Sequence, residues 1–140
     1  MQSPGYVAII HELGHEVRII PIELQPHVGP RLTQWLGDSR GHWEGDTLVI
    51  DTTNFSAKSS FRGSNTTLHL VKRFKRVGRS TLNYEFTVSD PDVSTRPWTV
   101  MIPLKGTDDK IYEYACHEGN TGMEGILSGH RVEEQAAQAR

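Results

Sequence analysis

The stretch that decides the fold is TLNYEFTVS, Thr81–Ser89, because its side chains alternate between apolar and polar without a break. Leu82, Tyr84, Phe86 and Val88 fall on one face of an extended chain, and the polar residues between them fall on the other. A period of two residues is typical of a β-strand with one buried face. The stretch therefore predicts a strand that contributes one side to a hydrophobic core.

The same alternation returns after the strand-breaking sequence Asp90-Pro91-Asp92, in residues 98–104. Two alternating runs joined by a short connection are typical of neighbouring antiparallel strands. The residues that we expect in the core from these two runs are Leu82, Tyr84, Phe86, Val88, Trp98, Val100 and Ile102.

Further strands are predicted on both sides of this pair. Segments rich in β-branched and aromatic residues lie at 6–10, 17–22, 47–53, 68–77 and 111–116. Residues 23–42 are rich in proline and glycine and predict a long ordered loop.

The end of the chain changes its period from strand to helix. A helix capped by Asn120 places Met123, Ile126 and Leu127 on one face and stops at Gly129, and a second, frayed helix follows over 132–139. We therefore predict a single all-β, mainly antiparallel domain over residues 1–140, with a short C-terminal helix. A lipocalin-like meander barrel is the first choice, since closure removes exposed sheet edges, and a β-sandwich is the second.

Composition and motifs limit the partners and cofactors that we expect for this chain. The formal net charge is −2 over 140 residues, which gives no reason to expect nucleic acid or an anionic membrane as a partner. Cys116 is the only cysteine, so no disulfide can form within the chain. The sequence contains no glycine-rich nucleotide motif and no GxSxG nucleophile motif, so no nucleotide cofactor is expected. A small-molecule ligand or substrate is the expected partner, and a homodimer is left open.

A long segment, WLGDSRGHWEGDTLVIDTTNF at residues 35–55, resembles the signature of a large family of uncharacterised proteins common in soil bacteria. LHLVKRF at 68–74, TRPW at 95–98 and EYACHEGN at 113–120 are similar to that family too. The resemblance implies a periplasmic or secreted protein, because family members usually carry a signal peptide. This sequence shows no signal peptide, which predicts a cytoplasmic location for the chain as it stands.

The chain differs from the family pattern at two positions of these segments. It has Lys72 where the family usually has Glu, and His42 where the family usually has Arg or Lys. The resemblance implies no particular activity.

The sharpest chemical motif is an HExxH, from His11 to His15. On a helix this spacing binds zinc, but Gly14 and the flanking β-branched residues favour a hairpin instead. In a hairpin with the loop Glu12-Leu13-Gly14, the two histidines would face each other on paired strands and hold a divalent metal, most naturally zinc. His117 or Glu118 would complete the metal site. Ordinary turn histidines are the structural alternative.

A second candidate centre lies near the predicted strand over 111–116. Glu118 shares a face with Tyr112 and Tyr114, and partial burial there would suit a general acid or base. The structural alternative is a carboxylate paired with an arginine, such as Arg40 or Arg73. Cys116 and His117 fall on opposite faces, so they are poorly placed as a nucleophile and its base. His69, on its own strand, is the other candidate catalytic residue.

Two functions follow as alternatives. The first is a hydrolase in which a metal ion, or a Glu/His pair, activates water against an ester or lactone, with Glu118 and His69 as catalytic residues. The second is a lipocalin-like binding module for a small apolar ligand, without catalysis. The residues that we expect to contact the substrate or ligand are Arg40, Trp35, Trp43, Trp98, Tyr112 and Tyr114.

Overall fold

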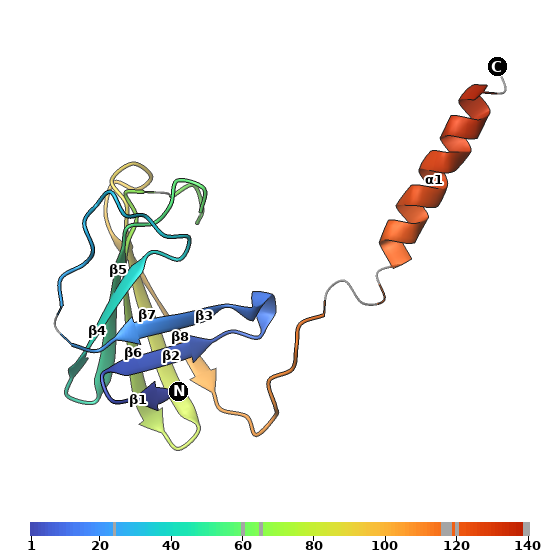
Figure 1. Cartoon of the computed structure of the whole chain (residues 1–140). Coiled ribbons are helices and arrows are strands. Elements are labelled where there is room, and N and C mark those ends of the chain that lie inside the picture. The colour runs from blue at the N-terminus through green and yellow to red at the C-terminus, as the bar shows by residue number, and fades with distance from the viewer. Residues whose placement is uncertain (24, 60, 65, 116–118, 120, 139–140) are drawn as a thin grey trace.

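The computed structural model describes residues 1–23, 25–59, 61–64, 66–115, 119 and 121–138. Two antiparallel sheets form the body (Figure 1). The small sheet has the order β1-β2-β3, and the large sheet has the order β4-β5-β6-β7-β8. In the order β1 to β8, the strands span Gln2–Ser3, Tyr6–Ile10, Val17–Pro21, Asp38–Glu44, Thr47–Thr53, His69–Gly78, Thr81–Ser89 and Trp98–Lys105.

The large sheet is a meander, because each of its strands pairs with the next one in the sequence. The expected closure into a barrel is wrong. Within the described residues, β4 and β8 remain the two edges of the large sheet, and the first three strands form a sheet of their own. The result is an all-β arrangement of two sheets, in which the strands of the small sheet cross those of the large sheet steeply (Figure 1).

The two sheets meet on the inner face of the large sheet, which carries the alternating apolar side chains. Val7 and Ile20 of the small sheet pack with Leu48 and Ile50 of β5. A second buried cluster lies farther along the large sheet, and its members are Phe55, Leu68 and Val88. Burial of apolar side chains from both sheets supplies the main driving force for this arrangement.

The predicted core is confirmed in part, since one of its seven residues, Val88, is buried and five are half-buried: Leu82, Tyr84, Phe86, Trp98 and Val100. Val88 is 2% exposed, and Phe86 and Trp98 pack against the second cluster. Ile102 also points to the inner face, but it is 41% exposed. Ile102 lies on the edge strand β8. Among the described residues, this strand has no extensive contact with the small sheet, so the side chain stays open to solvent.

Two predicted boundaries are wrong. The proline-rich loop ends earlier than expected, since Asp38–Glu44 forms β4. The predicted strand at 111–116 is absent in its described part, residues 111–115, which run as an irregular exposed segment. Without a partner strand beside it, this segment gains no backbone hydrogen-bond ladder, so its strand propensity alone does not form a strand.

The C-terminal helix exists but is longer than predicted. It is one helix, α1, Thr121–Gln138, which runs through Gly129. An isolated glycine costs helix stability but does not end a helix. All residues of α1 are exposed, and the helix extends away from the two sheets (Figure 1).

Candidate functional site

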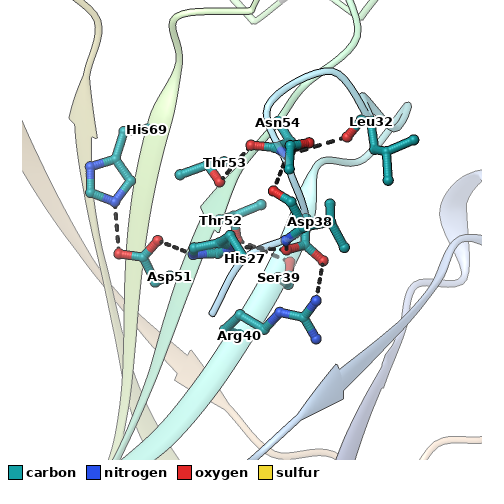
Figure 2. Close-up of polar contacts among 12 residues, drawn as sticks. His27, Leu32, Asp38, Ser39, Arg40, Asp51, Thr52, Thr53, Asn54 and His69 are labelled. Carbon is teal, nitrogen blue, oxygen red and sulfur yellow. Dashed lines mark hydrogen bonds and ion pairs between the residues drawn. The ribbon is translucent and has the colours of Figure 1, made fainter. Parts of the chain in front are cut away.

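A chain of five polar side chains crosses the outer face of the large sheet, the face opposite the one that carries Leu48 and Ile50; Figure 2 shows its contacts. We call it the outer-face relay, and its members in order are Arg40, Asp38, His27, Asp51 and His69. Arg40 Nη2 lies 3.1 Å from Asp38 Oδ1, and Asp38 Oδ2 lies 2.8 Å from His27 Nδ1. His27 Nε2 lies 2.9 Å from Asp51 Oδ1, and Asp51 Oδ2 lies 2.7 Å from His69 Nε2.

Strand register brings four of these residues together. Arg40 of β4 is paired directly with Asp51 of β5, so the two side chains emerge on the same face. Asp38 lies two residues before Arg40 and shares that face, as does His69 at the start of β6, by the alternation of side chains. The relay therefore depends on the pairing of three neighbouring strands.

The fifth member, His27, comes from the irregular segment between β3 and β4. This segment is fastened to the sheet by Asn54, whose side-chain amide donates hydrogen bonds to the carbonyl oxygens of Val28, Gly29 and Leu32. The backbone N–H of Val28 also donates to Asp38 Oδ2, at 3.1 Å. His27 is thus held by its own backbone neighbours as well as by its ring.

The ring of His27 bridges two carboxylates. Both of its ring nitrogens face carboxylate oxygens, and an ionised carboxylate only accepts hydrogen bonds. Through one nitrogen each, the ring therefore joins Asp38 of β4 to Asp51 of β5. Arg40 and His27 thus alternate with the two carboxylates along the relay.

His69 is the exposed end of the relay. Its side chain is 43% exposed, whereas that of Arg40 at the other end is 18% exposed. With Nε2 donating to Asp51, the neutral ring leaves Nδ1 as an acceptor. A histidine whose donor nitrogen is oriented by a carboxylate, and whose other nitrogen is free to take a proton, is the arrangement of a general base.

The predicted pairing of His11 with His15 is wrong. Ile10 pairs with Val17, and the next opposed pair is His11 with Glu16, whose backbone atoms form a hydrogen bond of 2.8 Å. His15 lies inside the 3₁₀ turn η1, Leu13–His15, and its Nε2 accepts a hydrogen bond from the backbone N–H of Tyr114. The turn is one residue longer than expected, which moves His15 out of register with His11.

The predicted ligand-contacting side chains do not line one cavity. Arg40 and Trp43 both belong to β4, but their side chains emerge on opposite faces of the large sheet. Trp98 packs edge-to-face on Phe86, at a centroid distance of 5.9 Å. Trp35, Tyr112 and Tyr114 are all exposed, the last two on the irregular segment after β8.

Three candidates of the sequence analysis, Cys116, His117 and Glu118, lie outside the described residues. The expected metal site therefore keeps only His11 and His15 as described ligands, and the expected catalytic pair keeps only His69. Among the described residues, no group of three or more histidine, cysteine, aspartate or glutamate side chains is arranged to hold a metal ion.

Asp38, Asp51 and His27 are functional candidates that the sequence analysis missed. Asp51 carried a signal, because it is the one charged residue in the otherwise apolar and threonine-rich run Thr47–Thr53. His27 carried no such signal, since nothing in an irregular segment predicts which strand its side chain will meet.

Comparisons of this chain with protein-family models, with curated proteins and with solved structures each gave no match. In the part of the chain that the structure describes, no helix is long and apolar enough to span a membrane.

Proposed function

We propose that this protein is a hydrolase of esters or lactones in which His69 acts as the general base. The observation that carries the proposal is the 2.7 Å hydrogen bond between His69 Nε2 and Asp51 Oδ2, on a ring that is partly open to solvent. The other oxygen of Asp51 is held by His27, so the carboxylate is fixed in the orientation that His69 needs. Such support from a further hydrogen-bonded group is what gives a catalytic histidine a defined tautomer.

The reaction begins when a water molecule donates its proton to His69 Nδ1 while its oxygen attacks the acyl carbon. Asp51 stabilises the imidazolium that forms. The tetrahedral intermediate then collapses and breaks the bond to the leaving oxygen, which takes the proton back from His69. An ester gives an acid and an alcohol, and a lactone gives one hydroxy acid. The choice of these substrates follows from their low barrier to hydrolysis.

The experiment is a hydrolysis screen on a panel of short esters and lactones, with the parent chain and His69→Gln. Loss of a general base typically lowers the rate by about 10²- to 10⁴-fold. The matched control is His42→Gln on the same face. His42 bonds Glu44 at the longer distance of 3.2 Å, and Glu44 is shared with Arg73. We expect the control to keep its rate within about twofold.

A parent chain with no activity on the panel would refute the proposal and leave the binding module as the better function. Equal rates for His69→Gln and the parent would remove His69 from the chemistry. Glu118→Gln, measured beside them, tests the prediction from the sequence that Glu118 is a general base.

Metal dependence is a separate prediction within this proposal. We expect added zinc to raise the rate if the water is activated by a metal ion as well as by His69. Elemental analysis of a His11→Ala, His15→Ala double variant tests the predicted ligands. Metal content equal to that of the parent would remove both histidines from the site.

A further inference from the structure

A groove of about 730 Å³ lies between the two sheets, on the side of the molecule opposite the outer-face relay. Its walls are mainly apolar and come from both sheets. They include Ile9 from the small sheet and Trp43, Phe74, Leu82 and Leu104 from the large sheet. The volume falls within the range of about 300 to 1,000 Å³ that is usual for small-molecule sites.

The groove is open to solvent. Trp43 is 46% exposed and Leu104 is 40% exposed, although both point to the inner face. Large apolar side chains that stay exposed together on a concave surface are typical of a ligand site. Edge strand β8 leaves this side uncovered, because the described residues pair it only with β7.

One end of the groove carries a cation, Arg76. Alternation along β6 points Arg76 to the same face as Phe74, and Arg76 is paired in register with Leu82. Its Nη1 donates to the backbone carbonyl oxygen of Arg79, at 3.1 Å, and none of the described carboxylates forms an ion pair with it. Asp46 also lines the groove, but it is paired with Lys75 at 3.2 Å.

The charged side chains on the inner face of the large sheet are all cationic. In the five strands of the large sheet, all of them described, the inner positions include Lys72 and Arg76 and no acidic residue. An apolar groove that ends at an arginine without a carboxylate partner is complementary to a molecule with an apolar body and one anionic group. Arginine binds carboxylates strongly because its fork of N–H donors matches their two oxygens.

We propose that this groove binds an amphipathic carboxylate, of the class of medium-chain fatty acids, with its chain between the sheets and its carboxylate on Arg76. The groove and the relay lie on opposite faces of the large sheet, so this inference does not depend on the hydrolase. The charge at one end distinguishes the proposal from a site for a purely apolar ligand.

Calorimetric titration with decanoate and with decanol tests the proposal. We expect saturable one-to-one binding of decanoate, with an affinity at least about tenfold higher than that of decanol, because the carboxylate adds charged hydrogen bonds. Arg76→Gln should remove this difference. Arg79→Gln, which removes the same charge from the adjacent turn, should keep it.

A second variant tests the apolar part. Leu104→Gln replaces a partly exposed side chain and should weaken decanoate and decanol alike, with an unchanged circular dichroism spectrum as the check on folding. Equal affinities for the two ligands in the parent, or no binding of either, would overturn the proposal. A dimer in sedimentation that Leu104→Gln dissociates and decanoate does not would assign the groove to a second copy instead.

Discussion

Replacement of Asp38 by alanine is the perturbation that should damage the outer-face relay most. Asp38 is 6% exposed and accepts hydrogen bonds from His27 Nδ1 at 2.8 Å and from the Val28 N–H at 3.1 Å, and it pairs with Arg40 at 3.1 Å. Its loss leaves the Arg40 guanidinium and the His27 ring without their shared carboxylate. The Arg40 side chain is only 18% exposed, so water replaces that partner poorly.

The expected loss in the free energy of unfolding is about 3 to 5 kcal/mol, the usual cost of removing one partner from a buried charge pair. Urea unfolding followed by circular dichroism measures it. Asp46→Ala is the matched control, since Asp46 also pairs with a cation, Lys75, but on the exposed surface. Exposed ion pairs contribute little, so the control should unfold at the urea concentration of the parent.

Asp38→Asn separates charge from shape in the same experiment. The amide keeps the volume of the side chain, and its oxygen can still accept from the Val28 N–H, so its loss should be smaller than that of Asp38→Ala. A loss of less than about 1 kcal/mol for Asp38→Ala would show that the relay does not stabilise the fold and would refute this reasoning.

Three further predictions concern the fold itself. Phe86→Ala should cost about 3 kcal/mol in urea unfolding, the low end for a phenylalanine because Phe86 is only half-buried; a cost below about 1 kcal/mol would contradict its core position. Gly37→Ala should destabilise the fold far more than Gly45→Ala. Both glycines have positive φ, but a Cβ at Gly37 would lie 2.6 Å from the Thr53 carbonyl oxygen, whereas a Cβ at Gly45 would have no atom within 4 Å. Equal melting temperatures for the two variants would show that the close approach at Gly37 is absent. Burial lowers the pKa of Lys72 from its ordinary value of 10.5 to about 8, so between these pH values the unfolded chain binds more protons and the free energy of unfolding rises with pH. Lys72→Met should therefore be more stable than the parent at pH 7, and the difference in the free energy of unfolding should shrink toward pH 10. A difference that stays constant with pH would exclude burial of the Lys72 charge as its cause.

Strand prediction succeeded where the sequence pattern is local. Tyr6–Ile10, Thr47–Thr53 and Thr81–Ser89 form strands with the predicted bounds, because β-branched residues or strict alternation identify them without reference to a partner. Asp38–Glu44 was missed, since its small and charged residues have low strand propensity. Pairing with β5 forms this strand, and pairing is not visible in one segment.

The site was predicted only in part, for the same reason. His69 was singled out from the sequence, but its partners Asp51 and His27 were not. A strand register and the path of an irregular segment bring these three together, and both are properties of the whole sheet. The arrangement of Glu16 opposite His11 likewise depends on the length of the hairpin turn, which the motif HExxH does not specify.

A double-variant cycle on hydrolysis by Asp51→Asn and His69→Gln tests whether the two residues work as one general base. The amide of Asp51→Asn can donate to His69 Nε2, which would favour the tautomer with its proton on Nδ1 and so remove the free acceptor. Residues that act as a unit are not additive. We predict that kcat/KM of the double variant falls no further than that of His69→Gln alone. Losses that multiply, with Asp51→Asn and His69→Gln each lowering the rate independently, would contradict the relay.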